Sequence, residues 1–228
     1  MFKKFWKVLI SSFCCLLLFS DANNSYGEEK IYTHKELVRK ESVLYDKITD
    51  TKIYGLIREY SPASGKLLCE TPYKNGKENG IKKCFSHAGN LYNETPYNDG
   101  KTNGVGKVFY ESGKIFSETP YINGKVHGVL KRFYESGNIF GETPYKDGQI
   151  DGVHQFFYES GKLKSKTSYK NGKRDGVEVR YRRSGYLFQE IIFEDGVAVS
   201  GFLNTFWGNK RRMSDSELQE INSEQNEY

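Results

Sequence analysis

Five glutamates recur at one place of a repeating pattern, and paired carboxylates of this kind can act as general acid and general base. These residues are Glu70, Glu94, Glu118, Glu142 and Glu190. Catalysis needs different side chains converging on a pocket, whereas a repeat supplies the same side chain many times. We therefore interpret the column as a solvated acidic row and predict no catalytic residues.

The four histidines are the next candidates, because imidazole is a common metal ligand. His34, His87, His127 and His154 occupy different positions of the repeating pattern and share no metal-ligand spacing. No glycine-rich phosphate loop follows a strand and opens a helix, and no Ser, His and Asp set is suggested. The sequence thus predicts no metal, no cofactor and no enzymatic activity.

Two cysteines, Cys69 and Cys84, fall within one predicted hairpin. An oxidising compartment would permit a disulfide between them. Whether their side chains face each other depends on the register: an even turn length puts them on the same face, and an odd one on opposite faces. Both alternatives stay open at this point, a disulfide or two ordinary packing residues.

Aromatic side chains are the candidates for partner binding, because they bury large areas in interfaces. Adjacent residues of a strand point to opposite faces, so pairs such as Phe109 and Tyr110 predict aromatic rows on both faces of a sheet. We expect one such face to bind a partner, while stacked rings also stabilise the sheet. The candidate residues are Tyr92, Tyr110, Tyr134, Tyr158, Phe116 and Phe140.

A 24-residue repeat positions all of these residues, with six copies between Leu67 and Lys210. A clear copy, from Ile115, reads IFSETPYINGKVHGVLKRFYESGN. Each copy contains Asn-Gly or Asp-Gly, the strongest short hairpin signal, since both residues tolerate positive φ. A second turn of the Glu-Ser-Gly type follows, and runs rich in Thr, Tyr, Phe and Val lie between. The turn glycines are Gly76, Gly100, Gly124, Gly148, Gly172 and Gly196.

This repeat predicts an all-β fold, in which 24-residue hairpins form one extended, twisted, antiparallel single-layer sheet. A second glycine column, four residues after the turn glycine, predicts a bulge or the close approach of another group. The prolines of the Thr-Pro-Tyr column cannot donate a ladder hydrogen bond. Each proline must therefore lie at a bulge or face away from its neighbouring strand.

The two ends of the chain look like caps, which repeat arrays need in order to cover their terminal edges. A short helix is predicted around His34 to Lys40, and another from Ser214 or Asp215 through Glu224, where Glu217 completes a capping box. We interpret the basic triplet 210–212 as a solvated linker. The predicted division is a signal peptide at 1–22, an N-terminal cap at 23–41, hairpin repeats at 42–210 with clear copies at 67–186, and a polar tail or helix at 211–228.

The N-terminus has the pattern of a secretory signal. Lys3, Lys4 and Lys7 precede an apolar stretch from Val8 to Phe19. Small residues favour cleavage after Ala22, and Ser25 and Gly27 offer a second possible site, after Gly27. We therefore expect an exported protein, in the periplasm, at the cell surface or in the medium. Without residues 1–22 the net charge falls from +5 to +3. That charge is too small and too evenly spread to indicate nucleic-acid binding.

The unit Tyr-x-Asn/Asp-Gly-Lys-x-x-Gly-Val, followed by Phe-Tyr-Glu-Ser-Gly-Lys, resembles the MORN repeat variant of many bacterial proteins, over at least Leu67 to Gly185. The resemblance implies a scaffold without catalytic residues. Proteins of that kind are often labelled antitoxins, and related arrays serve as protein-binding or membrane-associated scaffolds. We expect a protein partner in the envelope or at the cell surface, with toxin neutralisation as the alternative. Association with lipid headgroups ranks third, because the charge is small and no basic amphipathic helix is present.

Overall fold

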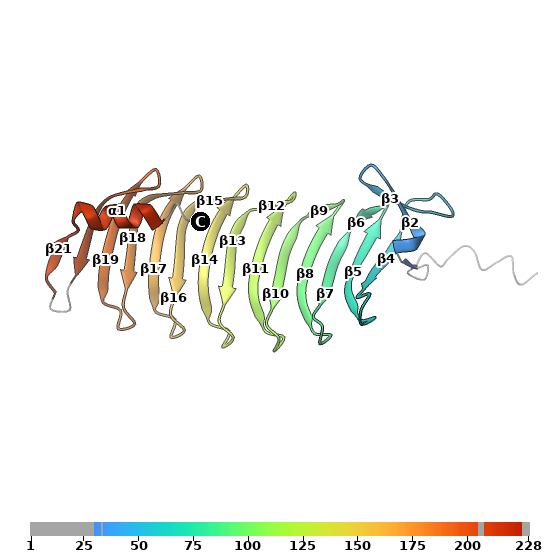
Figure 1. Cartoon of the computed structure of the whole chain (residues 1–228), viewed down its shortest axis with the longest axis horizontal. Helices are drawn as coiled ribbons and strands as arrows, with labels where there is room; N and C mark the ends of the chain where they lie inside the picture. The colour runs from blue at the N-terminus through green and yellow to red at the C-terminus, as the bar shows by residue number, and fades with distance from the viewer. Residues whose placement is uncertain (1–29, 33, 205–207, 225–228) are drawn as a thin grey trace, which may run out of the picture.

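One long sheet of successive hairpins dominates the computed structural model, which describes residues 30–32, 34–204 and 208–224 (Figure 1). Its strand order follows the chain from hairpin to hairpin, and the sheet contains 19 strands. The predicted all-β hairpin array is confirmed. The predicted signal peptide, residues 1–22, lies outside the described residues.

Each repeat contributes a long outgoing strand, a turn, and a return strand that most copies interrupt after two residues. The outgoing strands are β5 (Leu67–Lys74), β8 (Leu91–Asn98), β11 (Ile115–Ile122), β14 (Ile139–Lys146), β17 (Leu163–Lys170) and β19 (Leu187–Glu194). The short strands after the turns are β6 (Lys77–Glu78), β9 (Lys101–Thr102), β12 (Lys125–Val126) and β15 (Gln149–Ile150). The return strands are β7 (Gly80–Phe85), β10 (Gly104–Phe109), β13 (Gly128–Phe133), β16 (Gly152–Phe157), β18 (Lys173–Tyr181) and β20 (Val197–Asn204).

The Asn-Gly and Asp-Gly pairs form two-residue turns, as predicted. Asn123 has φ 49° and Gly124 has φ 88°, and the residues that flank them pair directly. Positive φ at both positions gives a turn whose twist matches that of the strands. The Gly124 N–H donates to the Thr102 carbonyl of the preceding repeat at 2.8 Å. The same turn therefore closes one hairpin and joins it to its neighbour.

The proline column and the second glycine column lie against each other at a bulge. Tyr121 pairs with Val126, but the register shifts before Glu118 pairs with Lys131. At the shift, the His127 N–H donates to the Pro120 carbonyl at 3.0 Å. Gly128 has φ 111°, and a Cβ there would lie 3.1 Å from Pro120 Cγ. The glycine thus supplies both the backbone conformation and the space that the proline ring fills.

The register divides the side chains between two faces, because paired residues point to the same side. We call the side that carries Thr71, Thr95, Thr119, Thr143 and Thr167 the threonine face. We call the other side, with Ile81, Val105, Val129, Val153 and Val177, the valine face. Thr143 is only 3% exposed, whereas Val129, on the valine face, is 44% exposed. Neighbouring side chains therefore close over the floor of the threonine face.

The N-terminal end of the threonine face is covered by a two-stranded sheet, β2 (Leu37–Lys40) and β3 (Val43–Asp46). Leu44 and Ile53 form a buried cluster with Ile57 of β4 (Gly55–Tyr60). Ile57 pairs with Thr71, so the cluster lies on the threonine face. Figure 1 shows this cap at one end of the array.

The C-terminal end of the same face is covered by α1 (Asp215–Glu224). Leu218 and Ile221 of the helix pack against a buried cluster that includes Ile191 and Phe193. Ile191 pairs with Glu178, which pairs with Thr167. The two caps therefore cover opposite ends of one face (Figure 1).

The predicted C-terminal helix and its capping box are confirmed. The Glu217 N–H donates to Ser214 Oγ at 3.3 Å, and the Ser214 N–H donates to Glu217 Oε2 at 2.7 Å. A hydrogen-bonded ion pair with Arg211 and the Ser214 N–H lower the pKa of Glu217 to about 2. The capping box therefore satisfies the amides of Ser214 and Glu217 at the start of the helix.

Three expectations about the ends are wrong. The predicted helix around His34 to Lys40 is a single 3-10 turn, His34–Glu36, and the residues after it form β2 because they pair with β3. The supposed linker is strand β21 (Lys210–Arg212), which pairs with β20 and covers its edge. The sheet is also not wholly antiparallel, since β1 (Ile31–Tyr32) pairs with β4 in parallel.

We predict that Gly128→Ala lowers the free energy of unfolding by about 1–3 kcal/mol for the positive φ, with a further loss because the new methyl group meets Pro120. Gly137→Ala is the matched control, since Gly137 has φ 93° and a Cβ added there would have no atom within 4 Å. Urea denaturation of both variants measures the difference. Equal losses would show that the contact with proline contributes nothing.

Candidate binding surface

Small residues form the floor of the threonine face, and tyrosines line one side of it. Tyr121 pairs with Gly104 across the strands, and a Cβ at Gly106 would lie 3.1 Å from Tyr121 Cε2. The tyrosine ring therefore lies over the floor where the neighbouring strand has no side chain. Matching tyrosines occur in the other copies: Tyr73, Tyr97, Tyr145 and Tyr169.

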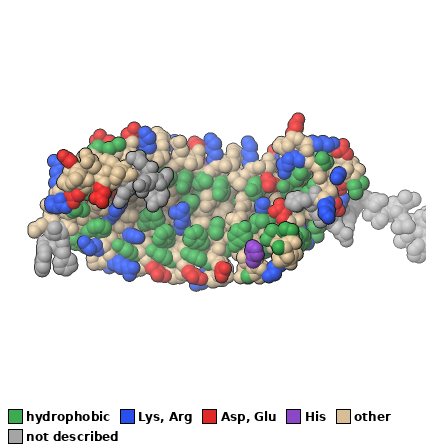
Figure 2. All heavy atoms as spheres, in the orientation of Figure 1, with side chains coloured by type: hydrophobic (Ala, Val, Ile, Leu, Met, Phe, Trp, Pro, Cys, Tyr) green, Lys and Arg blue, Asp and Glu red, His purple; other side chains and the backbone are tan. Residues whose placement is uncertain are grey.

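The other side of the floor is lined by the predicted binding aromatics. Phe140 lies 5.2 Å from Phe156 between ring centroids. Phe156 pairs with Gly141 on the threonine face, so Phe140 reaches this face too. Tyr92 and Phe116 are 46% and 37% exposed at matching places. Figure 2 shows apolar side chains gathered along the face on which α1 lies, with charged side chains mainly at the long rims.

The tyrosines of the Phe-Tyr pairs do not follow the expected alternation, because β10 ends at Phe109 and Tyr110 starts the turn. The Tyr110 hydroxyl donates to the Phe133 carbonyl of the next repeat at 2.7 Å. Its ring meets Phe116 edge to face, with centroids 5.2 Å apart. Tyr134 and Tyr158 repeat the hydrogen bond one and two copies later. Each of these tyrosines therefore ties one hairpin to the next, and its role in partner binding stays a prediction.

The glutamate column is not an acidic row, so that interpretation is wrong. Glu118 pairs with Lys107 on one side and with Lys131 on the other. Lys131 Nζ lies 3.9 Å from Glu142 Oε1 in the next strand. Opposite charges thus alternate across the valine face, which stabilises neighbouring strands.

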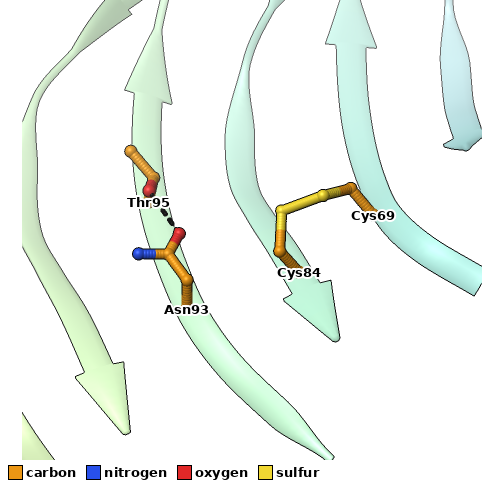
Figure 3. The surroundings of a disulfide bond; sticks show 4 residues. All are labelled: Cys69, Cys84, Asn93 and Thr95. Carbon is orange, nitrogen blue, oxygen red and sulfur yellow. Dashed lines mark hydrogen bonds between the residues drawn. A yellow bond between two sulfur atoms is a disulfide. The ribbon is translucent and has the colours of Figure 1, made fainter. Parts of the chain in front are cut away.

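The structure bonds Cys69 to Cys84, which resolves the alternatives left open by the sequence. The two residues pair directly across β5 and β7. Figure 3 shows the disulfide beside Asn93 and Thr95, where the Thr95 hydroxyl donates to Asn93 Oδ1 at 2.8 Å. The bond crosses the floor of the threonine face next to the N-terminal cap, since Cys84 also pairs with Asn93.

A buried carboxylate, Glu178, lies near the C-terminal cap and is 3% exposed. Arg180 Nε donates to its Oε1 at 2.6 Å, and Arg174 Nη1 lies 3.7 Å from its Oε2. The Thr167 hydroxyl donates to the same Oε2 at 3.2 Å. The sequence analysis missed this group, although a signal existed: matching positions in other copies hold Gly106 and Leu130.

His154 lies beside this ion-pair group, on the threonine face, where it pairs with Thr167. Its ring centroid is 4.4 Å from that of Phe156 and 6.1 Å from that of Tyr169. Burial among these rings lowers the pKa of His154, and the nearby Arg132 lowers it further. Nε2 is buried and has no hydrogen-bond partner among the described residues. At neutral pH the imidazole is therefore uncharged.

A pocket of about 360 Å³ lies between the N-terminal cap and the start of the threonine face. Its lining mixes cations and carboxylates with apolar groups. Burial raises the pKa of Tyr73, one of the lining residues, to about 12. The lining residues are Leu37, Arg39, Leu44, Ile57, Glu59, Thr71, Tyr73, Glu78 and Lys82.

Within residues 30–32, 34–204 and 208–224, no group of three His, Cys, Asp or Glu side chains could hold a metal ion. In the same part of the chain, no helix has the length and apolar character needed to cross a bilayer.

Three stretches of the chain match the family model described as MORN repeat variant: residues 102–123, 126–147 and 150–171. Each stretch starts in the short strand after one Asn-Gly or Asp-Gly turn and ends at the next such turn. The chain therefore contains three tandem MORN-variant repeats, which are its central hairpins.

No curated protein matches the chain. Among solved structures, one similar to this chain is a Bacteroides fragilis protein described as having unknown function, with 10% sequence identity and a TM-score of 0.13. The match covers 71% of this chain and 90% of that one.

We predict that Tyr134→Phe lowers the free energy of unfolding by about 1 kcal/mol, because the bond to the Phe157 carbonyl is lost. Tyr145→Phe is the matched control, since the Tyr145 hydroxyl bonds no described residue. Denaturation midpoints of the two variants compare the tyrosine rows directly. The idea that the Tyr134 row joins hairpins fails if the two variants are equally stable.

Proposed function

We propose that this protein is an exported, non-enzymatic scaffold that binds a partner protein on the threonine face. The observation that carries the proposal is the position of the caps. Both lie on this face, at opposite ends, and Figure 1 shows no described element over the central hairpins between them. An uncovered face with aromatic rows on both sides is typical of a protein interaction site.

The valine face is the less suitable of the two for specific recognition. Its alternating glutamates and lysines are paired with each other across the strands. Its exposed valines recur identically, as in Val105, Val129 and Val153. The threonine face changes from copy to copy, with Gly106, Leu130 and His154 at one position. The threonine face therefore offers differences in size, charge and aromaticity by which a partner can be recognised in one register.

The arrangement of the polar groups supports a scaffold without catalytic activity. The repeated threonines and tyrosines supply identical hydroxyls. The buried Glu178 carboxylate is held by Arg174 and Arg180, so neither of its oxygens is free to take a proton from a substrate. A binding role requires no more than the surface that these residues form.

Export is supported by the disulfide and by the signal-like N-terminus. Structural disulfides persist in oxidising compartments and are rare in the cytosol. The bond between Cys69 and Cys84 fits such a compartment. The signal pattern is a feature of the sequence and lies outside the described residues. The disulfide is an independent feature of the structure, and the proposal of export rests on both.

We predict that the native protein is found outside the cytoplasm and begins near Asn23 or Glu28. Mass spectrometry of the intact chain measures the N-terminus. Alkylation before and after reduction measures the cysteines, and we expect Cys69 and Cys84 to be modified only after reduction. An intact Met1 in a cytoplasmic fraction with both thiols free would overturn the proposal of export.

The binding face is tested by site-specific photo-crosslinking in the source cells. We predict that a photoreactive phenylalanine at Tyr121, on the threonine face, gives one crosslinked protein, and that the same group at Val129, on the valine face, gives none. The product is identified by mass spectrometry, purified and tested for binding to the Thr119→Trp variant, which obstructs the floor. Crosslinking from Val129 alone would move the site to the opposite face.

A further inference from the structure

The central part of the threonine face is not uniform, because its C-terminal half carries arginines. One row runs across the strands from Arg132 through Gly141, Phe156 and Ser165 to Arg180. Four strand spacings of about 4.8 Å separate the two arginines, or about 19 Å. The aromatic Phe156 lies halfway between them.

This half of the face keeps a positive charge after its internal pairing. Glu178 is the carboxylate that Arg174 and Arg180 share. The side chain of Glu178 is 4% exposed, while that of Arg180 is 44% exposed, so the guanidinium reaches solvent and the carboxylate does not. Arg132 has no acidic partner among the described residues and is half-buried. An arginine in this state binds a carboxylate with two parallel hydrogen bonds when one is offered.

The conformation of a peptide on this face is limited by the sheet itself. Adding a strand requires an unpaired sheet edge, and the edges of this sheet are at the ends of the array. Across the threonine face, each hairpin adds about 9.6 Å, or two strand spacings. A polyproline-II chain has three residues per turn and rises about 9.3 Å per turn. One turn of such a chain therefore spans one hairpin, and aromatic-lined grooves are the surfaces that bind it.

We propose, building on the proposed function, that the C-terminal half of the threonine face binds an acidic polyproline-II segment of the partner protein. The segment lies across the strands, with one carboxylate at Arg132 and a second at Arg180. Six residues of polyproline II span about 19 Å, which matches the separation of the two arginines. The side chain midway between the carboxylates then lies over Phe156 and His154, where an apolar group fits the rings.

The segment recognised therefore has an acidic residue at positions i and i+6 and an apolar residue at i+3, with prolines between. The rim beyond the aromatic row is mixed in charge over these hairpins, with exposed Glu135 and Glu159 beside exposed Lys162, Arg182 and Arg183. The path of the ligand is therefore set by the two arginines on the face and not by the rim.

The probe is a fluorescein-labelled peptide, Glu-Pro-Pro-Leu-Pro-Pro-Glu, titrated with the native chain by fluorescence anisotropy. We expect saturable binding of this peptide. A peptide with Lys in place of both Glu residues is expected to bind more weakly, by roughly tenfold or more. A register control carries the second Glu at i+4 instead of i+6. Only one of its two carboxylates can then reach an arginine, so we expect it to bind through that single contact. Equal binding of the Glu and Lys peptides would overturn the proposal.

Two protein variants with the same change of charge locate the site. Arg132→Glu changes the threonine face at a residue whose cross-strand partners, Ser117 and Gly141, are uncharged. Lys166→Glu changes the valine face, also between uncharged partners, Gln155 and Val179. We expect roughly tenfold weaker peptide binding for Arg132→Glu and less than about a twofold change for Lys166→Glu. Circular dichroism of both variants checks that the sheet is intact.

Equal weakening by the two variants would show a response to net charge alone and would overturn the assigned site. Heparin separates a specific peptide site from a general polyanion site. Displacement of the peptide by heparin, together with full binding of the register control, would overturn the proposed peptide chemistry. Crosslinking from Tyr121 is independent of these results. If it succeeds while the peptides fail to bind, the scaffold function stands and the chemistry of its ligand is wrong. If crosslinking fails from both Tyr121 and Val129, the scaffold function itself is wrong.

Discussion

The two-residue turn with positive φ at both positions is the constraint on which this molecule depends. It pairs the residues on either side of each Asn-Gly or Asp-Gly directly, as in Ile122 with Lys125. A slip of one residue would exchange the two faces of every strand that follows. Because each of the six turns has the same conformation, equivalent positions point to the same side in every copy, as threonine, proline and tyrosine do in the four copies from Leu67 to Lys162. The existence of a threonine face therefore follows from backbone geometry at the turns.

A single-layer sheet has no second layer to bury its surfaces, so its stability comes from contacts between neighbouring copies. Cross-strand pairs contribute about 0.2–1 kcal/mol each, and the array repeats them many times. At one rim the turn glycines bond the preceding copy, and at the other rim tyrosine hydroxyls bond the next copy. Such nearest-neighbour terms leave the ends weakest. The structure reinforces the first complete hairpin with a disulfide, and its 15-residue separation corresponds to about 3 kcal/mol.

Most of the repeated architecture could be predicted from the sequence, because repetition makes local signals agree. The turns, the bulge at the prolines and the need for the second glycine all follow from Asn123, Gly124, Pro120 and Gly128 and their equivalents. The bulge itself explains why the register could not be predicted. It shifts the pairing between Tyr121 and Glu118, and nothing in the turn alone reveals this shift.

The side-chain partners depend on that register and could not be predicted without it. The glutamates form a recognisable column in the sequence, but only the register places Lys107 and Lys131 opposite Glu118. Tyr110 follows Phe109 as a strand residue would, although the strand ends between them. The capping residues predict the C-terminal helix, whereas the three basic residues of β21 carry no strand signal of their own.

Departures from the repeat are where a symmetric array acquires specificity. Identical copies offer a ligand equivalent registers one hairpin apart, so an unbroken array would bind without a defined position. The caps remove the end registers, and the substitutions at Arg132, His154 and Glu178 make the remaining hairpins different from one another. The valine face keeps its exposed valines over the same hairpins, and its paired charges extend as far as Glu142, beyond which Gln155 and Val179 replace the lysines. The two faces thus differ in role. The valine face repeats its valines and pairs neighbouring strands, and the threonine face varies, which allows it to distinguish ligands.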